Sequence, residues 1–141
     1  MSGEFAARKL QKSRQHFRWK RRGYKYKVLN WRKTKNPLEG APQATGLVLA
    51  KRMVEQKQPS SGMIKAVRVR LLKNGKELTA FVPRSGAINH IAEHDHVTIE
   101  GLGGSQKGPI GSMWGVRWKV VKVNGISLEE IRKGKKQKPT R

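Results

Sequence analysis

The chain has 141 residues, no cysteine, and 32 lysines and arginines against nine acidic residues, which gives a formal net charge of +23. The lack of cysteine excludes disulfides, thiolate metal sites and cysteine nucleophiles. The charge predicts a polyanionic partner. Nucleic acid fits better than a membrane, because no apolar stretch approaches the roughly 18–20 residues of a membrane span and the basic segments lack a wide apolar face.

Residues 1–36 form a basic extension that is rich in aromatic side chains. It holds thirteen lysines or arginines, one acid, and six of the nine aromatic residues. Rings and guanidinium groups stack on bases while ammonium groups contact phosphates, so this mixture favours RNA. We expect helical pieces near 5–20 and 25–35 that are ordered mainly by RNA; the alternative is a solvated tail with a few docked rings. The candidate RNA-binding residues here are Arg8, Lys9, Arg14, Arg18, Trp19, Lys20, Arg21, Arg22, Tyr24 and Lys25.

Residues 37–131 predict an all-β domain. The five expected strands span 46–55, 66–72, 78–82, 96–100 and 116–123. The second strand alternates apolar and basic residues, and Asn74-Gly75 after it predicts a hairpin. A terminal helix over 127–132 has Ser127 as a candidate N-cap and Glu130 at the capping-box spacing. Five short strands in about 80 residues favour a small Greek-key barrel such as the OB-fold.

Two loops of this domain have unusual compositions. In the loop 56–65, Ser60 and Ser61 offer hydroxyls for a ribose 2′-OH or a base edge, and Lys57 and Lys65 suit phosphates. A Pro-Ser-Ser-Gly run is also an ordinary turn. The loop 101–115 contains six glycines, but no helix pattern follows its single lysine, so it does not match a nucleotide-binding loop.

Three histidines, His90, His94 and His96, form a weak candidate for a divalent metal site. They fall on a predicted turn that enters a strand, so the alternative is a polar turn with surface histidines near RNA. No nucleophile elbow or oxyanion loop is recognisable, and neither a catalytic residue nor a cofactor is expected. Arg117 and Lys119 are expected on one face of the last strand. This face is either simply solvated or a basic surface that lies against RNA, and both can hold at once.

The last ten residues, 132–141, form a second basic segment with six lysines or arginines and no acid. Phosphate contacts from the two basic extensions are expected to supply most of the affinity for RNA. The candidate residues of this tail are Lys133, Lys135, Lys136 and Lys138.

The ordered run of motifs in the domain resembles the universal small-subunit ribosomal protein twelve (S-twelve) family, most closely its archaeal and eukaryotic branch. The matching stretches are 38–42, 57–61, 65–69, 72–75, 79–83, 93–95, 115–123 and 138–139. The resemblance implies an OB-fold with a long N-terminal extension buried in the small ribosomal subunit, and two loop tips at the decoding centre. It places Lys57, Gln58, Pro59, Ser60 and Ser61 in the first tip, and Ser112, Met113, Trp114 and Gly115 in the second.

The same resemblance implies the partners of the chain. These are small-subunit ribosomal RNA, other small-subunit ribosomal proteins, and the mRNA and tRNA at the decoding site, all in the cytoplasm. No membrane contact and no homo-oligomer are expected.

The chain departs from the family pattern at both tips. The family's first tip commonly reads Pro-Asn-Ser-Ala where this chain has Pro-Ser-Ser-Gly at 59–62, and its second reads Asp-x-Pro-Gly where this chain has Ser-Met-Trp-Gly at 112–115. One interpretation is an ordinary ribosomal protein with compensating changes in its RNA. A second is a paralogue that alters or silences decoding. Two other classes stay open: a free-standing OB-fold translation factor or RNA chaperone, and a metal-dependent enzyme built on the histidines.

Overall fold

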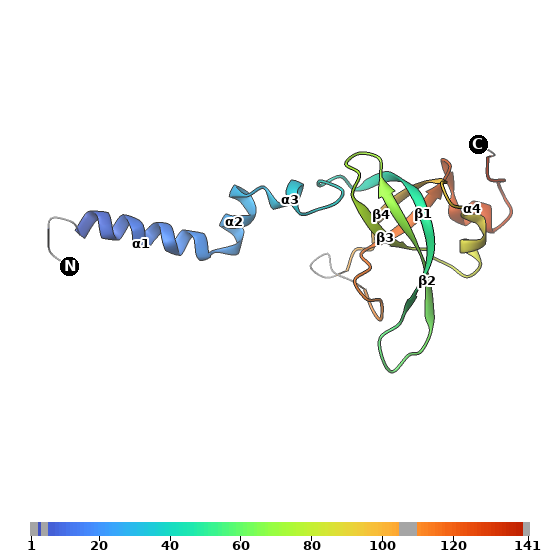
Figure 1. The fold of residues 1–141 in the computed structure, drawn as a ribbon, viewed down its shortest axis with the longest axis horizontal. Helices are drawn as coiled ribbons and strands as arrows, with labels where there is room; N and C mark the ends of the chain where they lie inside the picture. Colours follow the sequence, from blue (N-terminus) through green and yellow to red (C-terminus); the bar gives the residue numbers. More distant parts are fainter. Residues whose placement is uncertain (1–2, 4–5, 105–109, 140–141) are drawn as a thin grey trace. The chain divides into compact units, whose positions relative to one another are not determined.

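The computed structural model describes residue 3 and residues 6–104 and 110–139. The chain divides into two compact units, Met1–Gly40 (unit 1) and Ala41–Arg141 (unit 2). Figure 1 shows helices in unit 1 and the strands in unit 2. None of the described helices is long and apolar enough to cross a membrane.

Unit 1 contains three helices, α1 (Ala6–Lys20), α2 (Arg22–Val28) and α3 (Trp31–Thr34), which confirms the expected helical pieces. No residue of these helices is buried. Aromatic rings meet edge to face where the helices join: the centroids of Trp19 and Tyr24 lie 5.2 Å apart. Unit 1 therefore depends on local helical bonds and a few ring contacts, as expected for a segment that has little apolar surface to bury.

Unit 2 is built on a mostly antiparallel sheet, which confirms the expected β core. Its strands are β1 (Gln43–Glu55), β2 (Met63–Leu71), β3 (Glu77–Phe81), β4 (His96–Gly101), β5 (Trp118–Val123) and β6 (Ile126–Ser127). The sheet order is β3-β2-β1-β4-β5-β6, and β3 also pairs in parallel with β5. That extra pairing closes a ring of five strands, with the short β6 added at its margin.

The core of unit 2 lies inside this ring. Alternate residues of β2 point inward, so Val67 and Val69 are fully buried while Arg70 is exposed. Gly46 lies where β1 pairs with β4 on one side and with β2 on the other. A Cβ atom there would be 2.4 Å from Cγ1 of Val69, so the close packing of the two strands requires glycine.

Two short helices, η1 (Ala87–His90) and α4 (Leu128–Arg132), complete unit 2. The helix expected over 127–132 is present, but the capping box is not: Ser127 is the N-cap residue and makes no side-chain cap hydrogen bond. Ser127 instead belongs to β6 and pairs with Lys122. Its strand pairing therefore takes precedence over the capping box that the local sequence predicts.

Two loops differ in extent from the sequence-based expectation. The expected hairpin at Asn74-Gly75 forms, but five residues, 72–76, link β2 to β3, and Gly75 adopts a φ of 67°. β2 begins at Met63, three residues earlier than expected. The reason is that its pairing with β1 continues as far as Glu55 opposite Met63, which leaves only 56–62 as the loop.

Candidate RNA interface

The two predicted loop tips lie against each other. The β1–β2 hairpin extends beyond the ring and ends in the loop 56–62 (Figure 1). Gln56 forms an isolated antiparallel bridge with Met113, and the backbone N–H of Lys57 donates to the carbonyl of Ser112 over 2.9 Å. Residues about 55 positions apart are thus joined by backbone hydrogen bonding into one surface, here called the paired tip (residues 56–62 and 112–115).

Hydrogen bonds inside the loop fix the shape of the first half of the paired tip. The hydroxyl of Ser60 donates to Oε1 of Gln56 over 2.6 Å, and the N–H of Gln56 donates to the carbonyl of Gly62 over 3.0 Å. A Cβ atom at Gly62 would be 2.5 Å from that same Oε1, so a larger residue there would require the end of the Gln56 side chain to move. The Gln58–Pro59 peptide bond is cis. Gln56, which the sequence analysis did not select, therefore organises the loop.

The second half of the paired tip has one buried and one exposed apolar side chain. Met113 is buried, whereas the ring of Trp114 is 60% exposed. The ammonium group of Lys57 lies 5.3 Å from the centroid of the Trp114 ring. A ring and a cation side by side at an exposed tip form a surface that can stack on a base and contact a phosphate at the same time.

The remaining predicted residues of unit 2 flank the paired tip less directly. Lys65, on β2, is half-buried, and its ammonium group lies 3.4 Å from Sδ of Met53. Arg117 is exposed just before β5. Lys119, which shares its face, is paired with Glu100 over 2.8 Å. The hydrogen bond from Lys119, followed by one from Gln43, holds the pKa of Glu100 below its ordinary value, so the basic character of this face is partly neutralised.

The predicted residues of the extension are open to a partner. Eight of the ten are exposed, and only Tyr24 and Lys25 are half-buried. The guanidinium of Arg18 lies 5.7 Å from the centroid of the Tyr24 ring. A groove of about 490 Å³ runs along α1 with Arg14, Arg18 and Tyr24 among its lining residues. A cationic group beside an aromatic ring can contact a phosphate while the ring stacks on a base, and this combination favours RNA as the partner.

Three of the four predicted tail lysines make ion pairs within unit 2. Lys133 pairs with Glu129 over 2.8 Å and Lys136 pairs with Glu130 over 2.9 Å, both at exposed positions. Exposed ion pairs contribute little net free energy. These lysines can therefore exchange their carboxylate partners for phosphates. These ion pairs are not predictable from the composition of the tail, because the acids belong to α4.

The pair of Lys138 with Asp95 is different because Asp95 is only 3% exposed. Its carboxylate also accepts hydrogen bonds from the backbone N–H of Ala92, over 2.7 Å, and from Nδ2 of Asn124, over 3.2 Å. Burial alone would raise the pKa of Asp95, but these three donors together lower it below its ordinary value. The structure therefore shows Lys138 attached to the turn before β4, where the sequence analysis expected an RNA-binding tail residue.

The three histidines do not converge. His90 ends η1, His94 lies in a turn with a φ of 64°, and His96 begins β4. Among the residues that the structure describes, no group of three or more histidines, cysteines and acids is placed to hold a metal ion. The alternative given above, a polar turn, describes these positions adequately.

A comparison with protein-family models adds an independent observation. A model described as ribosomal protein S12/S23 matches residues 31–141. The match covers all of unit 2 and the last helix of unit 1.

Proposed function

Because this chain belongs to the ribosomal protein S12/S23 family, we propose that it places its paired tip at the decoding centre of the small ribosomal subunit. Family membership makes it a structural, rRNA-binding component of the ribosome. The ring of unit 2, which we propose is an OB-fold, holds the two tips, and the basic residues of 1–36 and 132–141 contact ribosomal RNA.

The observation that carries the proposal is the joining of the two tips. Hydrogen bonding between 56–57 and 112–113 presents Lys57, Ser61 and Trp114 on one exposed end of the fold. A site that tests the geometry of a short RNA helix needs rigid groups. A mobile loop would adapt to correct and incorrect helices alike, and ordering it would cost conformational entropy. The hydrogen bond between Ser60 and Gln56 contributes this rigidity. mRNA and tRNA are then the neighbours of the tip.

The altered tip residues leave two versions of this function. In the first, Ser60 and Trp114 replace the usual asparagine and proline with compensating changes in the RNA. In the second, a ring that stacks on the decoding RNA silences or biases the particle, and the chain is a paralogue. In both versions the tip keeps the hydrogen bond of Ser60 with Gln56 and the backbone hydrogen bond between Lys57 and Ser112.

Sedimentation of a native lysate distinguishes the two versions. An ordinary decoding protein should occur in polysomes in proportion to small subunits. A silencing paralogue should occur in small subunits or idle ribosomes and be missing from polysomes. Absence from every ribosomal fraction would contradict both versions and return the free-standing translation factor or RNA chaperone as the better interpretation.

Replacing Trp114 by alanine is expected to change the frequency of miscoding without affecting incorporation into the small subunit. The side chain is largely exposed, and the ammonium group of Lys57 lies beside its ring, so its loss should leave unit 2 stable. A base stacked on the ring would lose about 1–3 kcal/mol. Reporter read-through in cells, together with the amount of the variant in purified small subunits, measures both effects.

The matched control is Trp114→Phe, which keeps an aromatic face and should restore most of the original miscoding frequency. A variant of Trp114 that fails to enter small subunits would show that the ring is needed for assembly, and the role proposed for it in decoding would be wrong.

A further inference from the structure

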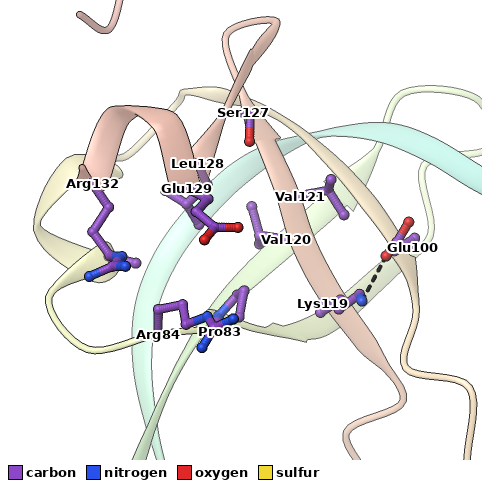
Figure 2. Close-up of a pocket in the computed structure, with 11 residues that line it drawn as sticks. Pro83, Arg84, Glu100, Lys119, Val120, Val121, Ser127, Leu128, Glu129 and Arg132 are labelled. Carbon is purple, nitrogen blue, oxygen red and sulfur yellow. Dashed lines mark ion pairs between the residues drawn. The ribbon is translucent and has the colours of Figure 1, made fainter. Parts of the chain in front are cut away.

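Unit 2 has a pocket away from the paired tip. It lies between the end of β3, the strand β5 and the helix α4, and its volume is about 240 Å³. Its lining includes the buried side chains of Ala87, Val120 and Leu128. Figure 2 shows Arg84 and Arg132 on one side and the ion pair of Lys119 with Glu100 on the other. The pocket thus has an apolar floor and a charged rim.

The charges on this rim do not cancel. Lys119 is neutralised by Glu100 over 2.8 Å, and Glu129 is neutralised by Lys133 over 2.8 Å. The hydrogen bond and charge of Lys133, followed by the charges of Arg84 and Arg132, lower the pKa of Glu129, so three cations share this one carboxylate. Moreover, Nε of Arg132 is buried and has no hydrogen-bond partner among the described residues. A buried donor without an acceptor is costly and rare in folded proteins, and with three cations sharing Glu129 the rim carries an excess of positive charge.

The character of the pocket favours a polypeptide as its partner. No aromatic ring lines it, so it offers no platform on which an RNA base could stack. Its volume is below the range of about 300–1,000 Å³ that is typical of small-molecule sites, and suits one or two side chains.

We propose that this pocket binds an acidic side chain of a neighbouring protein. The carboxylate of a glutamate or aspartate would lie between Arg84 and Arg132 and accept hydrogen bonds from their guanidinium groups. An apolar side chain next to it in the partner's sequence would pack on Val120 and Leu128. The site is separate from the RNA-binding tip, and it gives this basic chain a surface for a protein partner.

The test is a titration of the full-length chain, labelled with ¹⁵N and ¹³C, with short capped peptides followed by NMR. The probe is N-acetyl-Leu-Glu amide, and its matched control is N-acetyl-Leu-Gln amide. The Glu peptide is expected to shift the signals of the Arg132 Nε–H group and of the methyl groups of Val120 and Leu128. The Gln peptide should bind about tenfold more weakly, because hydrogen bonds to a charged acceptor are stronger.

Two variants assign the effect to the pocket. Arg84→Gln and Arg132→Gln should each weaken binding of the Glu peptide, whereas Lys122→Gln, an exposed residue of β5 outside the pocket lining, should not. Because either arginine variant could affect folding, the methyl spectrum of each free variant is compared with the original first.

Three outcomes would overturn the proposal: equal affinity for the Glu and Gln peptides, no shift at Arg132 with either peptide, or a stronger shift at the same residues with an RNA dinucleotide. The last result would assign the pocket to RNA instead of protein. None of these outcomes bears on the paired tip, whose role is tested separately through Trp114.

Discussion

Replacing Asp95 by alanine is expected to lower the free energy of unfolding of unit 2 by about 3 kcal/mol, since removing one partner of a buried ion pair leaves the other uncompensated. Asp95 is 3% exposed and joins three donors: Lys138, the backbone of Ala92, and Asn124. The side chain of Lys138 is 26% exposed, so it can turn partly toward water, which keeps the loss near the lower end of the usual range. Urea denaturation of the full chain, followed by near-ultraviolet circular dichroism, measures it.

The matched control is Lys136→Met, which removes an exposed ion pair with Glu130. That variant should change the free energy of unfolding by less than about 1 kcal/mol. Lys138→Met, in contrast, removes the cation while the hydrogen bonds from Ala92 and Asn124 to the buried carboxylate remain, and it should destabilise the chain clearly. If Asp95→Ala and Lys136→Met cost the same, the buried network does not hold the tail in place.

The same network predicts a dependence on pH. The pKa of Asp95 is lower in the folded chain than its ordinary value of 3.8, so its contribution to stability is fully present above that value. The contribution is lost as the pH falls through the lower folded pKa. The stability difference between the original chain and Asp95→Asn should therefore be constant near neutrality and shrink below about pH 4.

Deleting residues 1–36 is expected to reduce affinity for small-subunit ribosomal RNA about a thousandfold near physiological salt. The segment carries thirteen of the 32 lysines and arginines, and most of them are exposed. If about six of these cations contact phosphates, the plot of log affinity against log salt should become shallower by about 4–5 units on deletion. Filter binding of an rRNA transcript over a range of salt concentrations gives both quantities.

The control for the extension is the double variant Lys133→Gln, Lys136→Gln. These cations are already paired with Glu129 and Glu130, so fewer counterions are released when they bind RNA. The slope should change by less than about 1 unit for the two substitutions together, below the roughly 1.4–1.8 units expected for two lysines in full contact with phosphates. A deletion of 1–36 that leaves the slope unaltered would show that the extension does not contact phosphates.

The sequence predicts the strands of unit 2 well because their periodicity reports burial. The alternation of valine with arginine in β2 indicates which face is buried, and Asn74-Gly75 marks the turn that follows. The extent of the strands is harder to predict, because Met63 and Ile64 join β2 only through cross-strand pairing with β1. The parallel contact of β3 with β5, which closes the ring, leaves no local pattern at all.

The candidate site shows the same division. Composition and resemblance select Lys57, Ser60 and Trp114, and the structure brings their loops together. Sequence could not reveal that Gln56 orders the first loop, or that Lys138 reaches the buried Asp95 from 43 positions away. Both depend on contacts that only the folded chain creates. The composition of the basic tail is the same whether or not its lysines form ion pairs.

The most direct test of the central claim uses the absence of cysteine from the chain. A single Ser61→Cys substitution, at an exposed position of the paired tip, gives one attachment point for a tethered iron chelate. In reconstituted small subunits, hydroxyl radicals from that point are predicted to cleave ribosomal RNA at the decoding centre, and a Ser85→Cys control, exposed elsewhere on unit 2, should give a different pattern. Cleavage from Ser61→Cys that is absent from the decoding centre would contradict the account.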